Sequence, residues 1–141
     1  MTRVAAIAEI LTVGLPFCIF KLLTGAIALD TAAAPLGYAL IALGAIDAVL
    51  NLVNLASIIA ANRRIGGVCL ADLAARRLGG GDLGLAIDVF LSFALVAAVV
   101  GGSLFARMPA GTLVWWNWAV VANVLGAGIG RLFAALRERA P

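Results

Sequence analysis

Several polar side chains that ionise or form strong hydrogen bonds lie inside long apolar stretches of this chain. Charged groups are costly to remove from water, so each must face protein or water and find a partner. Such residues form ion pairs that fix how helices pack, or they line a path for an ion, a proton or a small solute. The candidates are Glu9, Lys21, Asp47, Asn51, Asn54, Asp88 and Arg131.

Four of these candidates form a first expected group. Asp47, Asn51 and Asn54 are spaced four and three residues apart, which places them on one face of a helix. At a helical rise of about 1.5 Å per residue, Lys21 lies about 12 Å from the end of its apolar run. Asp47 lies about 16 Å into the following run, so the two opposite charges are expected to meet.

A second group is expected near the other ends of the apolar runs. Glu9, Asp88 and Arg131 each lie about 7 to 8 Å from the end of a run, by the same rise per residue. This arithmetic predicts an inner cluster in which Arg131 lies between two carboxylates. Both groups admit two interpretations, structural ion pairs or a transport path.

Enzymatic chemistry finds little support in the composition. Histidine is absent, which excludes histidine general bases and histidine-ligated zinc or haem. The two cysteines, Cys18 and Cys69, lie in different segments and lack a metal-ligand spacing. We therefore predict no catalytic residues, no cofactor and no metal site, and we do not expect an enzyme.

Four apolar runs position these polar residues. Hydrophobic residues make up 65% of the chain and charged residues 12%, whereas a soluble domain carries roughly a quarter charged residues. A helix of about 20 apolar residues crosses a bilayer. The sequence predicts a single all-α integral membrane domain over residues 1–141, a four-transmembrane-helix bundle with spans at 4–29, 36–61, 83–106 and 112–136.

Basic residues are distributed unevenly between the two ends of the predicted helices. Lysine and arginine are retained on the cytoplasmic side of membrane proteins. With both termini inside, only Arg107 and Lys21 of the ten basic residues fall elsewhere. We predict a bacterial cytoplasmic (inner) membrane protein with both termini in the cytoplasm. Its cytoplasmic basic residues are Arg3, Arg63, Arg64, Arg76, Arg77, Arg131, Arg137 and Arg139.

The connection between the second and third runs contains a short amphipathic segment. Its apolar residues recur at helical spacing over 69–78, and glycine pairs or triplets flank it. We expect a helix that lies along the inner membrane surface. Anionic lipid headgroups are its expected partners, and no nucleic acid is expected; the lipid-facing basic residues are Arg63, Arg64, Arg76 and Arg77.

Proline and aromatic residues predict two further local features. Pro16 cannot donate a backbone hydrogen bond, so it should kink the first helix as a hinge and leave the carbonyl of Thr12 without its partner. Trp115, Trp116 and Trp118 cluster at the start of the fourth run, where an aromatic belt at the outer interface is expected.

Small residues recur every four positions in the last two runs. Such ridges let helix backbones approach closely, which is how helices associate inside a bilayer. The partner is another helix of this chain or a second molecule. The two series are Ala94, Ala98 and Gly102, and Ala122, Gly126 and Gly130.

Two functions remain open at the level of sequence. The first is a membrane protein that acts by assembly, as a homo-oligomer with copies of itself or as an accessory subunit bound to other membrane proteins. The small-residue series and the lack of a reactive constellation favour it. The alternative is a small transporter or channel whose polar path contains Lys21, Asp47, Asn51 and Asn54.

Overall fold

The computed structural model describes residues 3–80, 83–102 and 104–138, with side chains described as far as residue 130. Every regular element in these ranges is helical, and four helices are long and apolar enough to cross a membrane. The third of these four helices ends at Gly101, five residues before residue 106, where the third apolar run was expected to end. The elements are α1 (Arg3–Glu9), η1 (Ile10–Gly14), α2 (Leu15–Ala28), α3 (Ala34–Ala61), α4 (Leu70–Arg77), α5 (Leu83–Gly101), η2 (Phe105–Arg107) and α6 (Ala110–Glu138).

The irregularity expected at Pro16 takes the form of a helix that changes type. A π-helical turn, η1, precedes the proline, and Pro16 is the second residue of α2. The N–H of Leu15 donates to the carbonyl of Ile10 across this wider turn, so the helix continues past Pro16, although the carbonyl of Thr12 still lacks the N–H that Pro16 cannot supply. The first membrane-length helix, Arg3–Ala28, is therefore continuous in direction but built from α1, η1 and α2.

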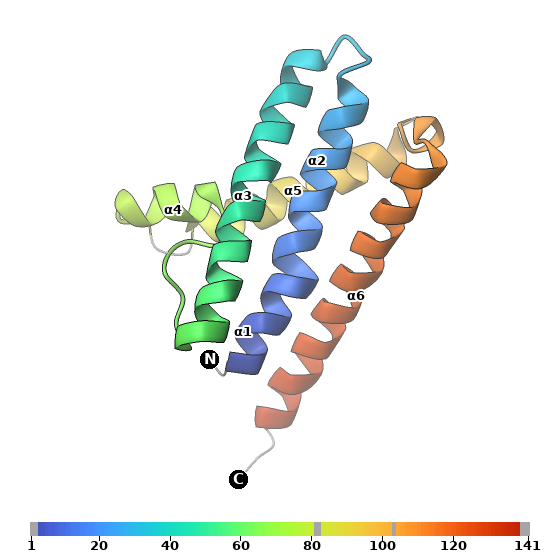
Figure 1. Ribbon diagram of the computed structural model, residues 1–141. Helices are drawn as coiled ribbons and strands as arrows, with labels where there is room; N and C mark the ends of the chain where they lie inside the picture. Colours follow the sequence, from blue (N-terminus) through green and yellow to red (C-terminus); the bar gives the residue numbers. More distant parts are fainter. Residues whose placement is uncertain (1–2, 81–82, 103, 139–141) are drawn as a thin grey trace.

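Helix α2 lies at the centre of the molecule and contacts α3, α5 and α6 (Figure 1). Its contact with α3 is close because glycines face one another. A methyl group added at Gly25 would lie 2.8 Å from the carbonyl oxygen of Gly37, and one at Gly44 would lie 3.1 Å from that of Cys18. This backbone approach between the first two spans was not predicted, because small-residue series were expected only in the last two.

An apolar core joins α2 to α5 and α6. Trp116 is 1% exposed, and its ring centroid lies 4.9 Å from that of Phe20, while Val99 contributes from α5. Trp115 and Trp118 are both exposed, as a belt requires. Trp116 is thus a core residue, because it lies on the face of α6 that packs against α2.

The chain between α3 and α5 folds back into the bundle. After α3 ends at Ala61, the chain returns along α3, and the backbone N–H of Leu70 donates to Asp47, fourteen residues before that end. Figure 1 shows α4 beside the middle of α3 and α5 passing behind α3 and α2. Helix α4 is therefore present where a short helix was predicted. It does not lie at the end of the bundle, however, because it begins beside Asp47, about 21 Å from the end of α3 by the rise per residue.

Candidate functional site

The returning segment, residues 62–70, is held by the polar stripe on α3. Asn54 makes three of these contacts: its Oδ1 accepts from the backbone N–H of Ile65 (3.1 Å) and of Gly66 (3.4 Å), and its Nδ2 donates to the carbonyl of Gly67 (2.9 Å). Irregular backbone leaves N–H and C=O groups unpaired, and in an apolar setting these need internal partners. Asn54, 2% exposed, supplies them.

Asn51, about one turn before Asn54 on α3, also holds the returning segment. Its Nδ2 donates to the carbonyl of Val68 (2.8 Å) and to that of Asp47 (2.9 Å), and lies 3.7 Å from the Cys18 sulfur. Its Oδ1 is buried and has no hydrogen-bond donor among the described residues, and it lies against Gly14, where a side chain would overlap it. The glycine therefore gives Asn51 the space to reach the returning segment.

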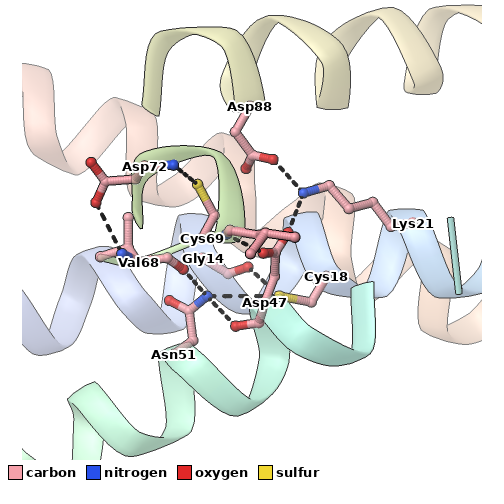
Figure 2. A network of polar contacts seen from close by, with 10 residues as sticks. Gly14, Cys18, Lys21, Asp47, Asn51, Val68, Cys69, Asp72 and Asp88 are labelled. Carbon is pink, nitrogen blue, oxygen red and sulfur yellow. Dashed lines mark hydrogen bonds and ion pairs between the residues drawn. The ribbon is translucent and has the colours of Figure 1, made fainter. Parts of the chain in front are cut away.

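Asp47 links this segment to a buried lysine (Figure 2). Its Oδ1 accepts from the N–H of Leu70 at 2.7 Å, and its Oδ2 accepts from Nζ of Lys21 at 2.6 Å. The side chains of Lys21 and Asp47 are only 7% and 3% exposed. The contact expected between these two charges is present.

A second carboxylate reaches the same lysine. Lys21 Nζ also donates to Oδ1 of Asp88, whose side chain is 13% exposed. One ammonium and two carboxylates carry one excess negative charge when all three are ionised. This group, Lys21, Asp47 and Asp88, is called the charged triad below.

The inner cluster expected around Glu9 has a different composition. Oε2 of Glu9 pairs with Arg64 at 2.6 Å, whereas Asp88 belongs to the charged triad. Gly84, the second residue of α5, packs directly against the backbone of Ala71 in α4. Helix α5 therefore begins beside α4 and not at the end of the bundle. As a result, Asp88 lies deeper in the bundle than the sequence predicted. The side chain of Arg131 lies outside the described residues.

The start of α4 is fixed by a compact set of contacts. Cys69 is the N-cap, and its sulfur accepts from the N–H of Asp72 at 3.4 Å. The Asp72 carboxylate is fully buried and accepts from the N–H of Val68 (3.1 Å) and from Nε of Arg76 (2.8 Å). Burial raises the pKa of the Cys69 thiol to about 12, so this cysteine is a neutral packing and capping group at ordinary pH.

A cavity of about 30 Å³ adjoins the charged triad, enough for about two water molecules. Its wall includes residues from α1, η1, α2, α3 and α5 and the returning segment. Glu9 and Asp88 both line it. The polar wall residues are Glu9, Cys18, Lys21, Asp47, Asn51, Cys69 and Asp88.

The remaining predicted residues divide by location. Within the fourth span, Gly126 packs against the side chain of Thr12, whereas a methyl group at Gly130 would meet nothing within 4 Å. Ala122 is half-buried, and Ala94 and Ala98 on α5 and Gly102, directly after α5, are exposed. Of the four basic residues predicted to face lipid, three are exposed: Arg63, Arg76 and Arg77. Arg76 forms an ion pair with Asp72. The fourth, Arg64, is half-buried and forms an ion pair with Glu9.

Comparisons with protein families, with curated proteins and with solved structures found no match for this chain.

Proposed function

We propose that this protein is a small membrane transporter or channel whose polar path includes the charged triad. The observation that supports this proposal most directly is one lysine shared by two carboxylates on the wall of a water-sized cavity, a group with one excess negative charge when all three side chains are ionised. An unbalanced charge away from water costs several kcal/mol unless a cation or water compensates it. Balanced structural ion pairs would not leave such a charge.

The returning segment supports the same proposal. Non-helical backbone halfway along a membrane helix is tolerated where it is buried in protein or lines a water-filled space. Residues 62–70 enter the bundle to the level of Asp47, and Val68 and Cys69 line the cavity. Broken or re-entrant backbone of this kind is characteristic of transport sites.

The placement in a bacterial inner membrane, with both termini in the cytoplasm, is part of this proposal. Arg3 at the start of α1 donates to the carbonyl of Ile59 near the end of α3, so these ends lie together. The exposed Arg63, two residues after the end of α3, lies at this side and supports contact with anionic headgroups. The cavity would then open toward the cytoplasm at Glu9.

Ion flux into vesicles tests the proposal. Purified protein is reconstituted into liposomes, and H⁺, Na⁺ and K⁺ movement is followed under a fixed membrane potential. We expect flux above that of empty vesicles and a loss of at least about tenfold in Asp88→Asn, equivalent to about 1.4 kcal/mol. Asp30→Asn, an exposed acid in the α2–α3 connection, is the matched control. Equal flux in protein-containing and empty vesicles for all three ions would refute the proposal.

Assembly is the second candidate, and the uncovered ridge on α5 favours it. Ala94 and Ala98 are exposed, whereas Gly126 of the other series already packs within the chain. Small residues on an open face permit close helix contact between molecules. Ala98→Leu should lower the native mass in mild detergent, while Ala86→Leu, an exposed alanine of α5 outside the series, should not. An unchanged mass in Ala98→Leu would argue against assembly through this ridge.

A further inference from the structure

We infer that Asp88 is the residue that takes up and releases a proton in the proposed path, an inference that rests on the transport function above. The two carboxylates of the charged triad differ in their partners. Asp47 uses both oxygens, one for Lys21 and one for the N–H of Leu70. Asp88 uses Oδ1 for Lys21, whereas its Oδ2 has no protein donor among the described residues. Figure 2 shows that second oxygen pointing away from the lysine.

The Asp88 side chain adjoins the cavity, which is large enough to hold water. Asp88 lines the cavity and its side chain is 13% exposed, compared with 3% for Asp47. In the part of the chain that the structure describes, two buried polar atoms also lack protein partners: Oδ1 of Asn51, a cavity residue, and Oγ of Ser92, four residues after Asp88 on the same helical face. Ser92 is 1% exposed. Unpaired buried atoms of this kind require water or a ligand proton.

A proton fits this site better than a metal cation. Hard metal ions take several oxygen ligands at once, but the Lys21 ammonium already occupies the space between the two carboxylates. Among the described residues, no group of three or more acidic or cysteine side chains is arranged to hold a metal. A proton needs only the one free oxygen that Asp88 offers.

The step is balanced in atoms and charge. A hydronium ion in the cavity transfers H⁺ to Oδ2 of Asp88, forming one O–H bond and leaving a water molecule. The charged triad becomes neutral overall, with Lys21 still paired to Asp47. Release to water reverses the step and restores the excess negative charge. Five other titratable groups line the same cavity as Asp88: Glu9, Cys18, Lys21, Asp47 and Cys69. A sixth, Asp72, lies on the neighbouring helix α4.

Carbodiimide labelling tests this inference on the wild-type protein. Dicyclohexylcarbodiimide modifies protonated carboxyls in apolar surroundings, and peptide mass spectrometry locates the modified residue. We expect labelling at Asp88 that accelerates at least about tenfold as the pH is lowered through the protonation range, and that Na⁺ does not suppress at constant ionic strength. Labelling confined to other carboxyls, or protection of Asp88 by Na⁺, would overturn the inference.

Infrared difference spectra provide the second measurement. Protein in lipid vesicles should show a protonated-carboxyl band that grows at low pH, shifts in D₂O and disappears in Asp88→Asn. The band should persist in Asp30→Asn and return in Asp88→Glu, with melting curves confirming that each variant folds. A band that survives in folded Asp88→Asn contradicts the assignment.

The two proposals fail in different ways. Labelling of Asp88 without ion flux would leave the proton site standing and remove the transport function. Proton flux that persists in Asp88→Asn would keep the transport function and remove the proton role of Asp88.

Discussion

The side-chain amide of Asn123 on α6 donates to the backbone carbonyl of Thr12, 3.4 Å away in η1. That carbonyl is the one that loses its helical partner because Pro16 has no N–H. A residue 111 positions away thus compensates for the proline, and it does so beside Gly126, which packs against the Thr12 side chain. The helix irregularity and the docking of α6 therefore depend on each other.

Replacing Asn123 with alanine should destabilise the protein by about 0.6–1.7 kcal/mol, the range for hydrogen bonds between membrane helices. The loss arises because the Thr12 carbonyl then has no donor. Thermal unfolding in detergent measures it. Asn117→Ala, an exposed asparagine on the same helix, should leave the melting temperature nearly unchanged. Equal effects of both changes would mean that the contact contributes nothing.

A methyl group at Gly14 should destabilise the protein by about 1–3 kcal/mol through overpacking. The added carbon would overlap Oδ1 of Asn51 and displace the amide that holds Val68. Denaturant unfolding of Gly14→Ala measures the loss. Gly128→Ala is the control, since a methyl group there meets nothing within 4 Å and should stabilise α6 by about 0.5–1 kcal/mol.

Removing Asn54 should loosen the returning segment without unfolding the bundle. Asn54→Ala deletes the acceptor for the N–H groups of Ile65 and Gly66. Hydrogen–deuterium exchange at these two amides should accelerate at least about tenfold, equivalent to about 1.4 kcal/mol of lost protection. Amides of α2 should keep their rates. Unchanged exchange at Ile65 would show that other contacts hold the segment.

Lys21→Met should destabilise the protein by about 3–5 kcal/mol, the cost of breaking a buried ion pair on one side. The change leaves Asp47 and Asp88 as two buried carboxylates without their shared cation. Adding Asp47→Asn and Asp88→Asn to Lys21→Met removes both charges and should recover much of the loss. Chemical denaturation of the single and triple variants distinguishes the cases, and no recovery would contradict the electrostatic explanation.

Alkylation should proceed slowly at Cys69 near neutral pH. Only the thiolate reacts, and burial raises the pKa of this thiol from 9.0 to about 12. Maleimide labelling followed by peptide mass spectrometry should show little modification at pH 7–8, compared with rapid modification of Ala74→Cys on the exposed face of α4. Rapid labelling of Cys69 at pH 7 would mean that the segment opens often.

The same shift sets the direction of a stability change with pH. The folded pKa lies above the unfolded one, so the folded state holds the thiol proton more tightly. This contribution is complete below pH 9 and is lost as the pH rises toward 12. Unfolding of Cys69→Ala across this window should show a weaker alkaline loss of stability than wild type. An identical slope in both proteins would contradict the linkage.

Local features of the chain were predictable from the sequence. Helix geometry depends on neighbouring residues, so the apolar runs determined four membrane-length helices. Helix geometry also placed Asp47, Asn51 and Asn54 on one face of α3. Lys21 was predictable as the partner of Asp47 because a short connection joins α2 to α3. The donor deficit at Thr12 was predictable for the same reason.

Contacts that depend on where the chain returns were decided by the tertiary structure alone. The sequence contains the segment 62–70 but does not specify its depth, which follows from backbone groups finding partners on Asn54, Asn51 and Asp47. That depth moves α5, and Asp88 with it, away from Glu9 and onto Lys21. Spacing along a helix is a local property, whereas the offset between two helices is the outcome of all the contacts in the chain that joins them.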